Sequence, residues 1–295
     1  MLLASAALAL PTNTLALPTR TSALSTSATN SSRGCPVRAS TTVLIYNETG
    51  AGGTGEFSGQ WETAFWSEWA ASDGRVQWQA IDAAGVQKCA VADLSSVAIW
   101  VQPGGNAYGY SQSMGAAGRA LVNGFLAAGG AYVGTCAGFY YASRGYYWEM
   151  DTQWSDKGYW AYPTLLSAFD ADTEGSIVEI EDEEGPDGVF KSHAATKITV
   201  DGNATHTVVY YGGPTVGLHR TPSRLPAGAT ARAVFDDVPG TPPAIVTVSR
   251  PGLELVLFSP HLEAHEGIGG VAITSAQRAA NYELRRAFIA PHLRG

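Results

Sequence analysis

One stretch near the middle of the chain, residues 131–140, restricts the fold more than any other. The apolar run Ala131–Val133 leads into Gly134-Thr135-Cys136-Ala137-Gly138, and helix-forming residues follow. Small residues on both sides of a cysteine suit a sharp strand-to-helix turn, because bulky side chains there would collide with the strand and the helix. The stretch therefore predicts a buried strand, a tight turn and a helix whose N-terminal dipole favours a thiolate at Cys136. The alternative is a small buried cysteine that serves packing only.

The composition argues against several classes of function. The 295-residue chain has a net charge of −8, with 15% charged residues, and it contains no cluster of basic residues. Nucleic acid is therefore not an expected partner. No run of 18 apolar residues follows the N-terminus, so no internal membrane span is expected. The length that remains after the N-terminal leader, about 260 residues, suits one large α/β domain or two small ones.

The first 34 residues differ from the rest. Met1–Leu10 is apolar like the core of a secretion signal, although no Lys or Arg precedes it and Pro11 ends it early. Residues 12–33 are rich in Ser, Thr, Ala and Pro, which is typical of a flexible linker. We therefore expect a secreted protein with a signal and linker at 1–34 and one domain at 35–295. A disordered leader without a targeting role is the alternative.

Two further features agree with secretion. Three N-x-Ser/Thr sequons are present, at Asn30, Asn47 and Asn203. The second and third fall within the expected domain and are candidate glycosylation sites. If Cys136 is a reactive thiol, Cys35 and Cys89 remain for a disulfide. Closing that loop would contribute roughly 4 kcal/mol by chain entropy. The alternative is two unpaired thiols in a reducing compartment.

Strand and helix patterns alternate in the first half of the domain. Strands are expected at residues 41–46, 76–81 and 96–101 and just before Cys136, and helices at 58–71 and 111–128. The first helix carries an apolar stripe of four aromatic residues, Trp61, Phe65, Trp66 and Trp69. This order predicts a doubly wound parallel sheet whose functional edge lies at the C-terminal ends of its strands. The turn Pro103-Gly104-Gly105 and Cys136 both fall on that edge.

From Lys197 onward the pattern changes to short strands and turns. Strands are expected at residues 198–200, 207–211, 231–235, 244–248 and 253–258. A closing helix is expected at 275–289, with Ala279, Leu284 and Phe288 facing inward. The sequence therefore predicts an antiparallel β elaboration that follows the parallel sheet.

Three other stretches allow more than one interpretation. A Gly-rich segment at 47–55 lacks the glycine spacing of a dinucleotide site, so a loop at the sheet edge is expected. Residues 170–181 place acids at calcium-loop positions, but Glu occupies the fifth position and no helix is expected next, so a solvated acidic turn is expected instead. The aromatic residues of 146–162 could form a hydrophobic lid or a packed surface excursion.

A reactive thiol needs a base, and the base needs a group that orients it. His261 follows the last strong strand and can reach the same sheet edge as Cys136. Glu263, two residues further on, can hold one imidazole tautomer. None of the other five histidines follows a strand in this way. Together with His265 the segment reads H-x-E-x-H, which matches no zinc spacing, so we expect no metal. The alternative interpretation of His261 is a structural histidine without a catalytic role.

These motifs resemble known families. The Cys136 turn, Pro103-Gly104-Gly105 and Ser259-Pro260-His261-Leu262-Glu263 together resemble the class I glutamine amidotransferase-like superfamily. More narrowly, residues 136–142 and Tyr210-Tyr211-Gly212-Gly213 resemble the domain at the N-terminus of eukaryotic biotin–protein ligases. The resemblance covers about Thr41 to Leu293. It implies a flavodoxin-like α/β fold with a Cys-His-Glu triad and no cofactor.

The resemblance also implies roles for individual residues. Carried over by position, Cys136 is the nucleophile, His261 the general base and acid, and Glu263 the residue that orients it. The backbone N–H groups of Gly105 and Ala137 form the oxyanion hole, which agrees with the amides that a Gly-Gly turn exposes. The implied chemistry is acyl transfer from an amide to the thiol, followed by hydrolysis.

Two functions of different classes follow. Because no synthetase domain and no ligase catalytic domain is expected in the chain, neither glutamine amidotransfer nor biotinylation is expected. The first expected function is a cysteine-dependent hydrolase or peptidase that acts on a small-molecule or peptide amide outside the cell. The second is a catalytically silent extracellular binding protein. The sequence does not fix an oligomeric state.

Overall fold

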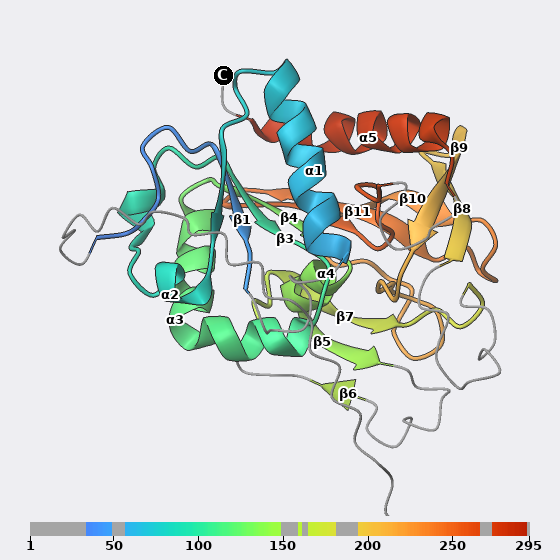
Figure 1. Cartoon of the computed structure of the whole chain (residues 1–295). Coiled ribbons are helices and arrows are strands. Elements are labelled where there is room, and N and C mark those ends of the chain that lie inside the picture. The colour runs from blue at the N-terminus through green and yellow to red at the C-terminus, as the bar shows by residue number, and fades with distance from the viewer. Residues whose placement is uncertain are drawn as a thin grey trace, which may run out of the picture. The chain divides into compact units, whose positions relative to one another are not determined.

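A nine-stranded mixed sheet forms the centre of the part of the chain that the computed structural model describes (Figure 1). That part comprises residues 34–48, 57–148, 159–160, 165–180, 194–265 and 273–293. The sheet has the order β2-β1-β3-β4-β12-β11-β10-β8-β9. Its strands are β1 (Val43–Tyr46), β2 (Trp78–Ile81), β3 (Ile99–Gln102), β4 (Ala131–Thr135), β8 (Ala194–Val200), β9 (Ala204–Tyr210), β10 (Ala229–Phe235), β11 (Pro243–Arg250) and β12 (Leu253–Phe258).

The two halves of the sheet differ in strand direction. Strands β2, β1, β3, β4 and β12 pair in parallel, in the order typical of a flavodoxin-like doubly wound sheet. Strands β11, β10, β8 and β9 continue the sheet with antiparallel pairs. The expected parallel sheet with a C-terminal antiparallel elaboration is therefore confirmed. The described residues from 34 onward belong to one compact unit, and residues 1–33 of the expected leader lie outside the described residues.

Helices cover both faces of the parallel half (Figure 1). α1 and α5 lie on one face, and α3 and α4 lie on the other. The helical segments are α1 (Phe57–Ser72), α2 (Ala83–Val86), η1 (Val91–Leu94), α3 (Ala107–Ala127), α4 (Ala137–Ala142), α5 (Ser275–Ile289) and η3 (Ala290–His292). The short α2 and η1 have no counterpart in the sequence-based expectation, because four residues are too few to show a helical period.

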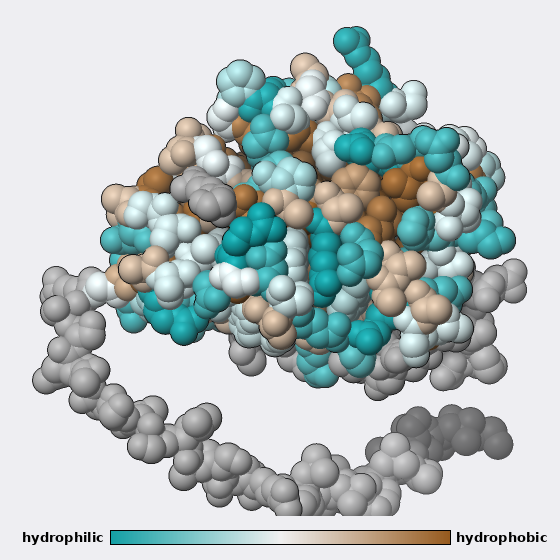
Figure 2. Space-filling model, turned by 90° about the horizontal axis from the view of Figure 1, so that it is seen from above, coloured by the Kyte–Doolittle hydropathy of each residue, from teal (hydrophilic) through white to brown (hydrophobic). Residues whose placement is uncertain are grey.

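The two faces of the sheet bury separate apolar clusters. Along β1, Leu44 and Tyr46 pack with α3 and α4, whereas Val43 and Ile45 pack with α1 and α5. Strands that are buried on both faces consist of continuous apolar residues, and this is why the sequence predicts them clearly. Seen from the side of α1 and α5, the surface is mostly hydrophilic or weakly polar, with smaller hydrophobic areas (Figure 2). The apolar sides of these helices face the sheet.

The inward face of α5 differs from the expectation. Ala279 is exposed and Leu284 is only half-buried, whereas Phe288 is buried as expected. The buried face instead consists of residues spaced three or four apart, namely Asn281, Tyr282, Arg285, Phe288 and Ile289. The expectation was wrong because it counted apolar residues alone, and two of the five buried residues are polar. One of them, Arg285, is a charge directed at the sheet.

A small second sheet replaces the expected acidic turn. It has the order β6-β5-β7, with β5 (Ser143–Trp148), β6 (Tyr159–Trp160) and β7 (Phe169–Gly175). The expectation of a solvated turn at 170–181 was therefore wrong over its first half. Glu174 is buried, and its carboxylate accepts four backbone N–H groups from residues 218–221 at 2.8–3.1 Å. Burial alone would raise the pKa of Glu174. The hydrogen bonds from these distant donors outweigh burial and lower that pKa.

A disulfide joins Cys35 to Cys89, with the Cα atoms 4.5 Å apart. This confirms the expected pairing and excludes the alternative of two free thiols. The bond ties the segment before β1 to the residues after α2.

Removing this disulfide is expected to lower the free energy of unfolding. The bond spans 54 residues of sequence, and cross-links of this kind stabilise by about 2–4 kcal/mol, mainly by restricting the unfolded chain. Urea denaturation of the Cys35→Ser/Cys89→Ser double variant measures the loss. Wild-type protein denatured under reducing conditions should show the same loss. An unchanged midpoint in both experiments would contradict the expected contribution.

Candidate functional site

Cys136 occupies the sharp turn between β4 and α4. Its backbone angles are φ 50° and ψ −107°, a conformation that costs energy for a residue with a side chain. Its N–H donates to the carbonyl oxygen of Phe258 at 2.8 Å, which joins the turn to the end of β12. Gly134 and Gly138 flank Cys136. A side chain at Gly134 does not fit, because its Cβ would lie 2.8 Å from the carbonyl oxygen of Gly138. The structure thus has the strand, tight turn and helix expected around Cys136.

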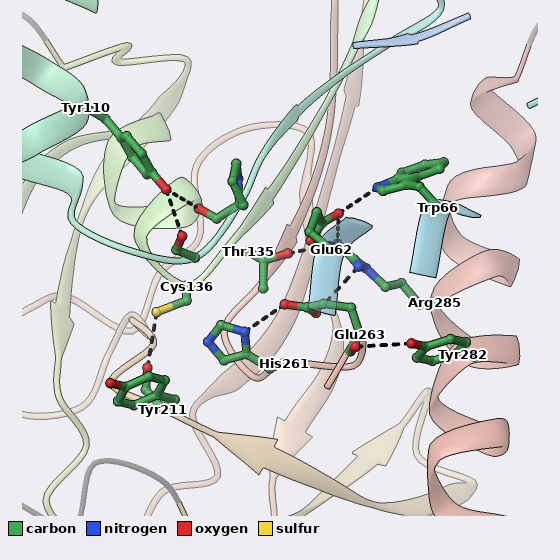
Figure 3. A network of polar contacts seen from close by, with 12 residues as sticks. Glu62, Trp66, Tyr110, Thr135, Cys136, Tyr211, His261, Glu263, Tyr282 and Arg285 are labelled. Atoms are coloured by element: carbon green, nitrogen blue, oxygen red, sulfur yellow. Dashed lines mark hydrogen bonds and ion pairs between the residues drawn. The ribbon is translucent and has the colours of Figure 1, made fainter. Parts of the chain in front are cut away.

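The strand register brings His261 to the same edge. β4 and β12 pair in parallel with Thr135 opposite Phe258, so the residues that follow each strand emerge side by side. The His261 N–H donates to the carbonyl oxygen of Val209 at 2.7 Å, which anchors the segment to β9. The ring of Trp61 contacts the imidazole edge-on at 5.3 Å between centroids. Cys136 and His261 therefore lie near each other at one sheet edge (Figure 3).

Glu263 holds the imidazole from behind. Its Oε1 lies 2.7 Å from Nδ1 of His261, and both side chains are fully buried. This contact fixes the tautomer so that Nε2 is directed away from Glu263. Burial alone would lower the pKa of His261, but the charge of Glu263 and the interactions with Cys136 outweigh it and raise the pKa to about 10. The carboxylate thus favours the imidazolium form of the buried ring.

The thiol has a second neighbour. Sγ of Cys136 donates to the carbonyl oxygen of Tyr211 at 3.2 Å. That carbonyl belongs to the turn after β9, which is fixed because Tyr140 Oη donates to the carbonyl oxygen of Gly212 at 3.1 Å and Tyr210 Oη donates to that of Gly213 at 2.7 Å. Within the described residues no partner hydrogen-bonds to Nε2 of His261. The thiol therefore has a backbone hydrogen-bond acceptor on one side and the buried imidazole beside it.

The expected oxyanion hole lies on the neighbouring strand end. Gly105 follows β3 with φ 144°, a conformation that favours glycine. Tyr110 Oη donates to the carbonyl oxygen of Gly104 at 2.7 Å and thereby fixes the turn. Ala137 is the first residue of α4, so its N–H has no partner within the helix. The two amides belong to the turns that follow β3 and β4, which are neighbouring parallel strands.

Two further charged residues, Glu62 and Arg285, complete the site and were missed from the sequence. Arg285 on α5 donates from Nη2 to both oxygens of Glu62 on α1, at 2.8 and 3.0 Å. Its Nη1 lies 3.5 Å from Oε2 of Glu263. Nη2 also donates to Oγ1 of Thr135, the residue before Cys136, at 3.1 Å. Figure 3 shows the contacts that run from His261 through Glu263 to Arg285 on α5 and on to Glu62 on α1.

The remaining expected site features have mixed outcomes. Asn47 and Asn203 are both exposed, as a glycosylated residue must be. Part of the aromatic segment packs against α4, because Tyr146 and Trp148 contact the ring of Tyr140 at 5.1 and 5.6 Å. Residues 149–158 and 161–164 lie outside the described residues, as does most of the Gly-rich segment at 47–55. Among the described residues, no three metal-ligating side chains cluster, and no helix is long and apolar enough to cross a membrane.

Residues 90–167 match the family model described as "Biotin-protein ligase, N terminal". The expected resemblance is confirmed. The matched segment runs from η1 into the second sheet, so it contains the Gly104-Gly105 turn and the Cys136 turn. It ends before His261 and Glu263. No curated protein matches the chain.

Solved structures show the fold of the whole domain. One described as a glutamine amidotransferase matches with a TM-score of 0.50 and 14% identity, over 84% of this chain and 98% of that chain. The N-terminal domain of mmIFT52 matches with a TM-score of 0.50 and 12% identity, over 84% of this chain and 96% of that chain. Likeness at such identities establishes the fold alone. The fold is therefore glutamine amidotransferase-like, as the sequence predicted.

Proposed function

We propose that the chain is a secreted cysteine-dependent amide hydrolase of the glutamine amidotransferase-like fold, with Cys136, His261 and Glu263 as its catalytic residues. The observation that carries the proposal is the strained conformation of Cys136 directly beside a buried His261–Glu263 pair. A side chain held at a positive φ persists only where the surrounding structure enforces it, and such positions concentrate at active sites. The disulfide and the exposed sequons support a location outside the cell.

The proposed reaction has two steps. In the reactive form the proton of Cys136 already lies on Nε2 of His261 as a thiolate–imidazolium pair, and the thiolate attacks the carbonyl carbon of an amide and forms a C–S bond. The N–H groups of Gly105 and Ala137 stabilise the oxyanion. The imidazolium then gives its proton to the leaving nitrogen, the C–N bond breaks and the amine departs. Water, deprotonated by His261, attacks the thioester, the C–S bond breaks and the acid and the thiol are released.

Labelling with an iodoacetamide probe at pH 7 tests the proposal. Cys136 is the free cysteine of the three, since the other two form the disulfide. We expect wild-type protein to label faster than glutathione, with the adduct mapped to Cys136 and absent in Cys136→Ser. The His261→Asn variant should label at least about tenfold more slowly, because a thiolate needs its cationic neighbour. His219→Asn, which removes a histidine paired with Glu179 instead, serves as the control.

The silent binding protein is the second candidate function. The observation that favours it is the limited access to the site: Cys136 is only 7% exposed, and its proton is held by a backbone carbonyl. If wild-type protein labels no faster than glutathione, the hydrolase proposal fails. Thermal stabilisation by a ligand that persists in Cys136→Ala would then support the binding function.

A further inference from the structure

The site contains more buried charge than a Cys-His-Glu triad requires. Glu62, Glu263 and Arg285 are all fully buried. Two carboxylates share one guanidinium, so this group of three carries an excess of one negative charge when both acids are ionised. The triad uses only Glu263 directly. The role of Glu62, a buried acid on a different helix, is not explained by the proposed chemistry.

The surroundings make this excess charge effective. The guanidinium of Arg285 lies over the rings of Phe65 and Phe258, at 4.5 and 5.4 Å from the centroids. Charges in such apolar surroundings interact more strongly than charges in water, because little solvent screens them. Burial raises the pKa of Glu62, but three hydrogen bonds from two donor atoms favour its ionised form: Trp66 Nε1 lies 2.7 Å from Oε1, and Arg285 Nη2 donates to both carboxylate oxygens.

We propose that Glu62 is a positioning residue: acting through Arg285, it keeps His261 in its imidazolium form by leaving the buried cluster one negative charge in excess. If Glu62 were neutral, Arg285 would balance the charge of Glu263, and burial would favour an uncharged imidazole. When Glu62 is ionised, Arg285 neutralises only one of the two carboxylates. The remaining negative charge then stabilises the imidazolium of His261 through Glu263. The inference rests on the proposed function in one respect, which is that His261 belongs to the active site.

Every charged or titratable group that faces His261 enters this argument. Glu263 contacts it from its own segment, Cys136 from the strand-helix turn and Tyr211 from the turn after β9, with ring centroids 6.1 Å apart. Behind Glu263 lie Arg285 and Tyr282 of α5, and Glu62 of α1. The guanidinium is the only permanent cation among them in the described residues, so the balance depends on whether Glu62 is ionised.

The test is the titration of His261 followed by ¹⁵N-edited NMR of its ring nitrogens. In wild-type protein His261 should stay protonated well above neutral pH. In Glu62→Gln, which keeps the hydrogen-bond acceptor and removes the charge, the midpoint should fall by about one pH unit or more. Glu68→Gln is the matched control, because Glu68 lies on the same helix and pairs with Arg278 of α5 at 2.9 Å, but is 44% exposed. Its midpoint should equal that of wild type.

A second variant decides the matter if Glu62→Gln does not fold. In Cys136→Ala no thiolate can hold the proton, so a raised midpoint for His261 must come from the carboxylates. A midpoint above neutral pH supports the inference. A midpoint at or below the ordinary histidine value in Cys136→Ala, or an unchanged midpoint in folded Glu62→Gln, overturns it. Neither readout needs turnover, so slow probe labelling with a responsive His261 would reject the hydrolase and leave the inference standing.

Discussion

Replacing Arg285 by alanine is expected to lower the free energy of unfolding by about 3–5 kcal/mol. The change leaves Glu62 without a cationic partner and Glu263 paired with His261 alone, and both carboxylates are at 0% exposure. Glu62 must then be protonated or hydrated in the folded protein, and either route costs energy. The guanidinium also packs against two aromatic rings, so the loss includes contact area as well as charge. Urea denaturation at pH 7 measures the effect.

Arg278→Ala provides the matched control for this prediction. Arg278 belongs to the same helix and pairs with Glu68, but both side chains are partly exposed, at 22% and 44%. Exposed pairs contribute little, so the control should lose about 1 kcal/mol or less. Adding Glu62→Gln to Arg285→Ala should recover part of the loss, because the charge that Arg285 had paired on α1 is removed. If Arg285→Ala unfolds at the same urea concentration as the control, the buried pair does not stabilise the fold.

The parts of the site near the strand ends could be predicted from sequence, because their signals are local. Cys136 and His261 each follow a strongly apolar strand, and parallel strands end at one edge of a sheet. The sheet order that makes those two strands neighbours is a property of the fold, and the family resemblance supplied it. The local patterns and the resemblance agreed, which is why the expected fold and the grouping of these residues match the structure.

The residues behind the triad have no such local signal. Glu62 and Arg285 are separated by 223 positions in the sequence, and no local pattern pairs them. A weaker signal exists in each helix: Glu62 lies among the aromatic stripe of α1, four residues before Trp66, and Arg285 lies three residues before Phe288. A charge within the apolar stripe of a helix must be paired when buried, so two such charges in one chain are candidates for each other.

The acidic segment at 170–181 illustrates the same limit. Its spacing of acids predicts a turn, yet β7 forms because Glu174 finds its donors in residues 218–221. Local sequence describes how polar a segment is, but not whether a distant segment satisfies its charge. The expectation for α5 was wrong for a related reason, since it treated every polar residue of the helix as exposed.

Gly138→Ala is the other change with a large expected effect. A Cβ at this position would overlap with the carbonyl oxygen of Gln102 and lie 2.9 Å from its carbonyl carbon. The nearest obstacle is the backbone of Gln102, so no rotamer change can relieve it. Either α4 moves away from β3, or the turn at Gly104-Gly105 shifts. We expect a loss of about 3 kcal/mol or more in the free energy of unfolding, at the upper end of overpacking effects.

Gly138→Ala should also change the geometry of the site in protein that still folds. Movement between α4 and the turn after β3 changes the distance between the amides of Ala137 and Gly105, and it displaces Cys136 from His261. Iodoacetamide labelling of folded Gly138→Ala should therefore be slower than in wild type. Gly74→Ala is the control, because an added Cβ there meets no atom within 4 Å, and its stability should change by about 0.5 kcal/mol or less. Wild-type stability and labelling in Gly138→Ala would mean that the close approach of α4 to β3 does not hold the two halves of the site together.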